Sequence, residues 1–150
     1  IIPYRTLGIP ETVARDGYKN FITYVVEPRK VRRPGSENNF KIFCEKISLR
    51  SLKVLDQSGL NVLGAGEDSI LFILVSHGSS GHGAYIGKGT NQTRQDPNAS
   101  SQELENGNGD LIFVSAPYST KKGASFRHLI TWKTQRNFAG ICTAHQLQIR

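Results

Sequence analysis

The sequence predicts an α+β domain in which antiparallel β-structure dominates. Two observations support this fold class: the segments rich in β-branched and aromatic residues have the length of single strands, and long polar stretches separate them. A third is that no helix of ordinary length is predicted, whereas a doubly wound α/β fold needs helices between its parallel strands. The 150 residues, 37% of them hydrophobic, are expected to form one soluble domain, residues 1–150.

Three segments have the clearest strand patterns. Ile70–Val75 is a continuous apolar run, typical of a strand covered on both faces, so we expect it to be the central strand. Asn20–Glu27 is rich in aromatic and β-branched residues. Phe126–Thr134 alternates in the manner of a half-buried antiparallel strand. The residues expected on one face of that strand are Phe126, Ile130 and Trp132.

Weaker signals predict the shorter elements. Phe40–Cys44, Leu49–Leu55 and Leu111–Val114 are candidate strands of low regularity. Glu11–Arg15 follows a proline and begins with an acid, which favours one helical turn. Asp56–Gly59 has the composition of a hairpin turn.

The other segments are expected to be irregular. Residues 29–39 are polar, and residues 87–110 are rich in Asn, Gly, Ser and Gln without periodicity, so both are expected to be loops. Residues 138–150 are expected to form a C-terminal tail or, over Ile141–Ile149, an edge strand.

The basic charge of the chain does not by itself identify a partner. There are 19 Lys and Arg against 12 Asp and Glu, a formal net charge of +7, but the basic residues are dense only in Arg29–Arg33. No stretch interleaves basic and aromatic residues as single-strand binders do, so nucleic acid is a possible partner without support. Cys44 and Cys142 are too far apart for a compact metal knuckle and could be a disulfide or two buried thiols.

The segment after the central strand invites an enzymatic interpretation. His77 lies in a Ser-His-Gly context like that of a caspase-type cysteine protease, and Cys142 would be the nucleophile. The surroundings of Cys142 do not match the caspase signature, and the helices of that fold are not predicted. We therefore expect no catalytic residues here. The structural loop is expected to consist of Ser76, His77, Gly78, Gly81 and Gly83, whose glycines permit a tight turn.

A metal site is the second enzymatic alternative. His77 and His82, with Glu103 and Glu105, are ligand types for a transition metal, but a flexible link of Gly and Ser separates the two histidines. We instead expect His77 to bond the backbone within the turn and His82 to point to solvent.

Three ordered segments resemble bacterial prepilin-type proteins, the type IV pilin-like and pseudopilin-like family. Ile2–Ile9, with the Asp-Gly-Tyr at 16–18 and Thr-Tyr at 23–24, is similar to the start of their periplasmic domain. Leu74–Gly78, continuing through Gly83–Tyr85, resembles a mid-domain strand and loop, and Phe126–Asn137 falls where the family has its closing strand. Glu103, Glu105 and Asn106 stand where the family places an acidic cluster with asparagine.

The resemblance implies a non-enzymatic, structural role. Family members anchor in the inner membrane through an apolar N-terminal helix and then assemble into a periplasmic or cell-surface filament of a type IV pilus or secretion system. This chain would be the pilin-like headpiece without that helix, in contact with other pilin-like subunits. A nucleic-acid-binding pilin for DNA uptake and, less favoured, a Cys/His hydrolase using His77 and Cys142 are the alternatives.

The family also suggests a metal, because some pseudopilins bind calcium before their final strand. Here Arg127 and His128 stand where the family usually has an aspartate pair, which removes two hard oxygen ligands. The sequence therefore predicts no cofactor and no metal. Glu103, Glu105 and Asp110 are the residues that could still contribute oxygens to calcium.

Overall fold

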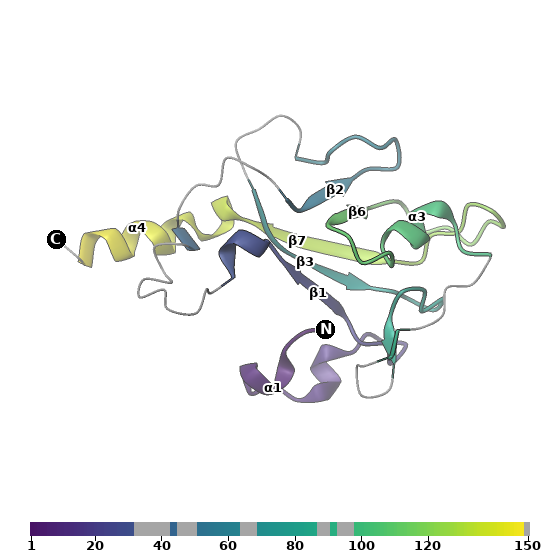
Figure 1. Ribbon diagram of the computed structural model, residues 1–150, viewed down its shortest axis with the longest axis horizontal. Helices are drawn as coiled ribbons and strands as arrows, with labels where there is room; N and C mark the ends of the chain where they lie inside the picture. Colours follow the sequence, from purple (N-terminus) through teal and green to yellow (C-terminus); the bar gives the residue numbers. More distant parts are fainter. Residues whose placement is uncertain (32–42, 45–50, 64–68, 87–90, 93–97, 149–150) are drawn as a thin grey trace.

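The computed structural model describes residues 1–31, 43–44, 51–63, 69–86, 91–92 and 98–148 (Figure 1). Helices and strands are mixed, and the largest sheet has three antiparallel strands in the order β1-β3-β7. This arrangement is compatible with the predicted α+β class. The three strands are β1 (Thr23–Val26), β3 (Ile70–Ser76) and β7 (Leu129–Thr134).

The apolar run at 70–75 forms the central strand, as predicted, but the expected cover on both faces is incomplete, because Phe72 and Leu74 are only partly buried. On one side Val25 of β1 pairs with Ile73, and on the other side Ile73 pairs with Trp132 of β7. Directly opposed residues share a face, so these side chains lie together on one side of the sheet, which we call the core face. The alternation predicted for β7 is confirmed, because exposed residues alternate there with half-buried ones such as Ile130 and Trp132.

A second, two-stranded layer covers the core face. It pairs β2 (Lys53–Leu55) with β6 (Ile112–Val114), and these strands are parallel, which the expectation of mostly antiparallel structure did not include. The hydrophobic core lies between the layers and contains Val54 and Phe113 from this pair. The buried residues that complete the core are Leu52, Ile70, Ile73 and Val75.

Short elements connect these layers. Asp56–Gly59 forms the predicted turn: the Gly59 N–H donates to the Asp56 carbonyl at 3.0 Å and φ of Gly59 is +82°. The remaining elements are α1 (Tyr4–Leu7), η1 (Glu11–Ala14), η2 (Pro28–Lys30), β4 (Tyr85–Ile86), β5 (Asn91–Gln92), α3 (Ser101–Glu105), η3 (Gln135–Phe138) and α4 (Ala139–Gln148). The helical turn predicted after Pro10 corresponds to η1.

The prediction of an edge strand in the C-terminal segment is wrong. α4 is a ten-residue helix, which also contradicts the expectation that no helix of ordinary length is present. The segment contains Ala, Gln and Leu, which favour helices, and it continues directly from η3, whose N-terminus carries a capping box of Thr134 and Asn137. An existing turn lowers the cost of nucleation, so local propensity decides in favour of the helix.

Two further expectations need correction. Phe43 and Cys44 are helical instead of extended, while the rest of the predicted strand at 40–44 lies outside the described residues. The region 87–110 is not loop throughout, because it contains β5 and α3. Ser100 caps α3, its hydroxyl accepting a hydrogen bond from the Glu103 N–H at 3.1 Å.

Candidate functional site

The turn that follows β3 is held close to its neighbours by glycines. Gly78, Gly81 and Gly83 all have positive φ, between +58° and +73°. A Cβ on Gly78 would lie 2.1 Å from the Arg127 carbonyl oxygen, and one on Gly83 would lie 2.5 Å from the Cα of Gly107. Only glycine combines this backbone conformation with such close approach. The turn therefore packs directly against the chain that leads into β7 and against the end of α3.

His77 continues the core face beyond the end of β3. It follows Val75 by two residues, so the strand period directs its ring to the same side, and its exposed fraction is 0%. The ring Nε2 is 2.8 Å from the hydroxyl oxygen of Thr23, which pairs opposite Val75. We expected a bond to the backbone of the turn; the ring Nε2 bonds a side chain on the neighbouring strand, and the backbone of His82 in the turn also interacts with the ring.

Two other histidines are buried beside it, and we call His77, His82 and His128 the histidine cluster. The rings of His77 and His128 meet edge to face with centroids 4.8 Å apart. His82 is 5% exposed, so the expectation that it points to solvent is wrong. Its Nε2 lies 4.0 Å from an oxygen of Glu103, because α3 covers the turn and closes off the solvent there.

Asn106 fixes the orientation and tautomer of His128. Its Oδ1 accepts from the Val114 N–H at 2.7 Å, which identifies Nδ2 as the donor to the Val114 carbonyl and to Nδ1 of His128 at 3.3 Å. An amide NH₂ can only donate, so Nδ1 of His128 accepts and the ring proton is on Nε2. Within the described residues neither this Nε2 nor Nδ1 of His77 has a hydrogen-bond partner.

Glu103 is a buried carboxylate with its acceptors in use. Its exposed fraction is 0%; one oxygen accepts from the Arg127 N–H at 2.9 Å and the other accepts from the Ser125 hydroxyl at 3.1 Å. These bonds join α3 to the segment before β7. Glu103 therefore acts as a structural link between two elements.

Burial keeps His77 and His128 neutral. Removal from water lowers the pKa of His77 to about 4, although the backbone of His82 and the charge of Asp16 act in the opposite direction. Burial, with smaller contributions from the neighbouring rings of His77 and His82, lowers the pKa of His128 to about 3. Both rings are consequently uncharged at neutral pH, and the site is a packed polar extension of the core.

The suggested catalytic pair is not brought together. Cys142 is bonded to Cys44, so it offers no thiolate. It also lies in α4, which follows the Thr134 end of β7, whereas His77 follows the opposite end of β3, because Ile70 pairs with Thr134. A strand of this length separates the two by roughly 20 Å at about 3.3 Å per residue.

The acidic residues suggested for calcium do not form one cluster. Glu105 and Asp110 each accept a hydrogen bond from the Asn108 amide at 3.1 Å, while Glu103 faces the interior. Across the ranges given above, no group of three or more His, Cys, Asp or Glu side chains could hold a metal ion, including the suggested set of His77, His82, Glu103 and Glu105.

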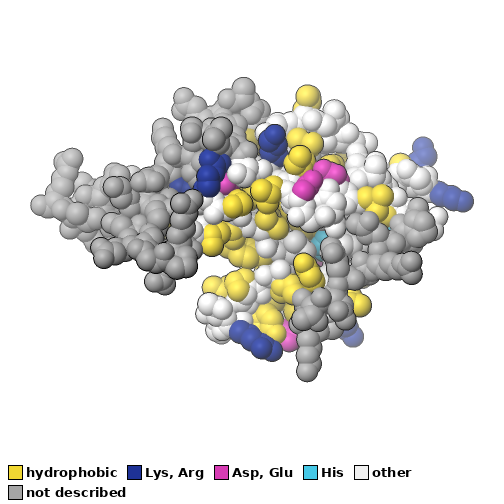
Figure 2. Space-filling model, in the orientation of Figure 1, with side chains coloured by type: hydrophobic (Ala, Val, Ile, Leu, Met, Phe, Trp, Pro, Cys, Tyr) yellow, Lys and Arg dark blue, Asp and Glu magenta, His cyan; other side chains and the backbone are white. Residues whose placement is uncertain are grey.

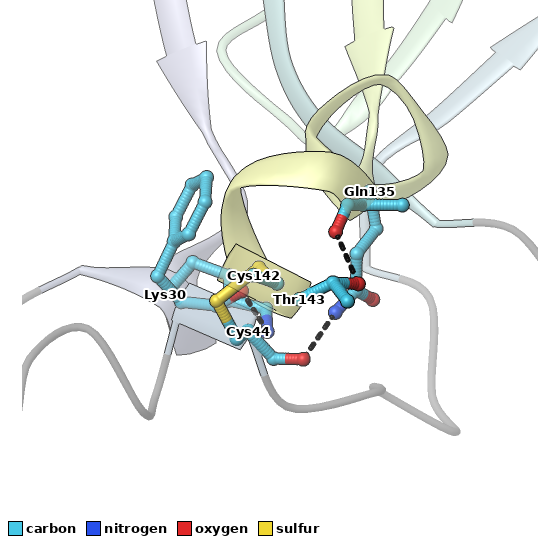
Figure 3. The surroundings of a disulfide bond; sticks show 7 residues. Lys30, Cys44, Gln135, Cys142 and Thr143 are labelled. Atoms are coloured by element: carbon cyan, nitrogen blue, oxygen red, sulfur yellow. Dashed lines mark hydrogen bonds between the residues drawn. A yellow bond between two sulfur atoms is a disulfide. The ribbon is translucent and has the colours of Figure 1, made fainter. Parts of the chain in front are cut away.

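The disulfide lies at the other end of the sheet (Figure 3). It joins Cys44 to Cys142 of α4 across 98 positions of sequence, which decides between the two alternatives for these cysteines. Gln135 donates its side-chain N–H to the Cys44 carbonyl at 2.9 Å, and Lys30 donates to the Phe43 carbonyl at 2.9 Å. Figure 3 shows these bonds converging on the short segment that carries Cys44, so α4 and this segment are tied to the body of the domain.

The second face of the sheet carries five apolar side chains beside the polar Ser76, Thr131 and Lys133, and it is only partly covered. We call it the open sheet face; its apolar members are Tyr24, Val26, Phe72, Leu74 and Leu129. Phe138 contacts Phe72 with ring centroids 6.5 Å apart and shields one end. At the other end Leu129 is 73% exposed. Figure 2 shows hydrophobic side chains gathered over the middle of the molecule, where Figure 1 has the sheet.

Comparison with models of protein families, with functionally characterised proteins and with solved structures finds no match in any of the three. None of the helices in the described ranges has the length and apolar character needed to cross a membrane.

Proposed function

We propose that the protein is a structural subunit, a pilin, minor pilin or pseudopilin, of a type IV pilus or type II secretion-like filament. It acts by protein–protein contacts and has no enzymatic activity, resident cofactor or metal. The observation that carries the proposal is the open sheet face. A partly exposed sheet face with several apolar side chains is typical of a layer that packs against a further element.

In this proposal the further element is an apolar helix upstream of Ile1. The Ile2 N–H donates to the Ile22 carbonyl at 3.3 Å, so the chain enters the domain beside the start of β1, near the sheet edge (Figure 1). A preceding helix could lie along the open sheet face from there. It would anchor the subunit in the inner membrane before assembly and then join the filament, so that the headpiece is periplasmic or on the cell surface.

The histidine cluster fits this role better than catalysis. A general base must reach its substrate, and a nucleophile must be accessible to it. His77 is completely buried and its pKa of about 4 makes it a weak base. Its neighbours connect β1, β3, α3 and β7, which favours a function in shaping the loops that a headpiece presents to other subunits.

The described basic residues give little support to the alternative of nucleic-acid binding. Within the basic segment, Arg29 donates to Glu27 at 3.2 Å and Lys30 donates to the Phe43 carbonyl, so both side chains have intramolecular partners. Arg32 and Arg33 lie outside the described residues. DNA binding that weakens steeply with salt would revive this alternative.

The first test of the proposal is the coding sequence that precedes Ile1. We expect the reading frame to continue into an apolar helix of about 20 residues after a short basic leader. An upstream stop codon, or a polar domain in place of the helix, would refute the proposal.

The second test is assembly of the full-length protein in its native cell. Leu74→Asp places a charge on the open sheet face, and we expect the subunit to disappear from the sheared surface-filament fraction. Leu60→Asp is the matched control, because Leu60 is 67% exposed in the turn region after β2. Equal recovery of both variants in the filament fraction would contradict a packing role for the face.

A further inference from the structure

A polar groove of about 440 Å³ lies between α3 and the segment at 116–126. Ser101 and Gln102 line it from α3, Gln57 from the turn after β2, and Tyr118 and Lys121 from the segment opposite. Phe126 contributes to its lining and is 2% exposed, so it gives the groove a firm wall. None of the residues that line the groove belongs to the histidine cluster or to the open sheet face, so the roles proposed for those two features do not account for the groove.

The segment that carries Tyr118 is held in a defined shape. Ser119 and Phe126 exchange two backbone hydrogen bonds, of 2.8 and 2.7 Å, and thereby close the segment into a small antiparallel loop. The Ala124 N–H donates to the Lys121 carbonyl at 3.0 Å, and Gly123 supplies the positive φ that this turn needs. The backbone that carries Lys121, and that follows directly on Tyr118, is therefore ordered before any ligand arrives, which lowers the entropy cost of binding.

The lining has a distinct chemistry. Among the described residues it contains several hydroxyl and amide groups, an aromatic ring that is 69% exposed on Tyr118, no acid, and one cation, Lys121. A side-chain amide both donates and accepts, so it can pair with the hydroxyls of a ligand. An exposed tyrosine offers a flat apolar surface with a polar end. The lysine adds a site for one negative charge.

We propose that this groove binds a short acidic saccharide. A sugar ring presents an apolar C–H face to Tyr118 while its hydroxyls meet Gln57, Gln102 and Ser101, and a carboxylate or sulfate meets Lys121. The volume falls in the range of sites for small ligands, about 300–1,000 Å³. The lining mixes polar groups with apolar ones such as Ala116, Pro117 and Phe126, and a nucleotide phosphate finds no arginine among the described lining residues.

This inference does not depend on the role in a filament. A headpiece that never assembles would still carry the groove, and a filament subunit could lack any ligand there. Binding by the isolated chain therefore tests the saccharide site alone.

The test is a glycan array probed with the 150-residue chain, followed by titration of sialyllactose and lactose using saturation-transfer NMR. The array includes matched neutral, carboxylated and sulfated glycans. We expect saturable binding with a two- to fivefold preference for sialyllactose over lactose, about 0.4–1 kcal/mol, which is within the range expected of one exposed charge. Tyr118→Ala should weaken binding at least fivefold, whereas Tyr18→Ala, which removes another exposed tyrosine at 61% exposure, should leave it unchanged.

Charge is tested separately from stacking. Lys121→Gln should bring the preference for sialyllactose close to one while lactose binding stays the same, and Lys122→Gln should retain the preference. Near-ultraviolet circular dichroism verifies that each variant is folded. Absence of any glycan bound above the level of the Tyr118→Ala variant would overturn the proposal, and so would equal losses in Tyr118→Ala and Tyr18→Ala.

Discussion

Acidification from pH 7 to pH 5 should destabilise this domain strongly through two buried rings. In the folded state the pKa of His77 is about 4 and that of His128 is about 3, whereas an unfolded histidine has a pKa of 6.5. Both rings are thus neutral when folded in this range, while the unfolded chain takes up protons as the pH falls below 6.5. The unfolded state binds more protons, so the free energy of unfolding decreases on acidification.

The size of the effect follows from the two shifts. A pH of 5 lies 1.5 units below the pKa of 6.5 of an unfolded histidine, so the unfolded ring is mostly protonated while the folded ring is largely neutral. This difference lowers the free energy of unfolding by about 2 kcal/mol per ring. Together the rings remove about 4 kcal/mol, a large part of the 5–15 kcal/mol that holds a typical domain folded. The loss should level off only below the folded pKa values.

Urea denaturation monitored by the fluorescence of Trp132, the one tryptophan, measures this directly at pH 7, 6 and 5. His128→Asn removes one titrating ring and should halve the loss between pH 7 and pH 5, relative to its own stability at pH 7. A total loss below about 1 kcal/mol, or an undiminished loss in His128→Asn, would refute the assignment of neutral buried rings.

Two other perturbations test the architecture. Replacing Cys44 and Cys142 by serine should lower the free energy of unfolding by up to about 4–5 kcal/mol, the loop-closure value for this separation, measured by urea denaturation without reductant; no change would mean that the bridge does not constrain the unfolded chain. Gly78→Ala should lower the free energy of unfolding by more than about 3 kcal/mol, because the added Cβ would meet the Arg127 carbonyl. Gly123→Ala is the control: its φ is also positive but no atom lies near the added Cβ, so the loss should be about 1 kcal/mol. Similar losses in the two variants, measured by urea denaturation, would contradict the close approach at Gly78.

Local patterns account for the elements that were predicted correctly. The apolar run at 70–75 and the alternation of Ile130 and Trp132 are properties of a few neighbouring residues, and each survives into the tertiary structure. The same two-residue period places His128 on the core face, in step with Ile130. The sequence therefore contains the signal for this residue, although our prediction names only the apolar positions of the face.

The features that could not be predicted depend on distant contacts. His82 is buried because α3 packs over its turn, and nothing adjacent to it in sequence indicates that cover. Asn106 orients His128 although the two residues are 22 positions apart, and no local sequence pattern predicts that they are in contact. In α4 the short mixed pattern suits either a strand or a helix, and the preceding η3 turn decides the outcome.

The bridge between Cys44 and Cys142 has a mechanical consequence. Its span of 98 positions in a chain of 150 leaves only about a third of the contour free to lengthen when the two termini are pulled apart. β3 and β7 lie within the closed loop and are shielded from such tension, whereas β1 lies outside it. A load applied at the N-terminus would therefore peel β1 from the edge of β3, one backbone pair at a time, and then stop. The pairing of β3 with β7 would be kept, because both strands lie inside the loop that the disulfide closes.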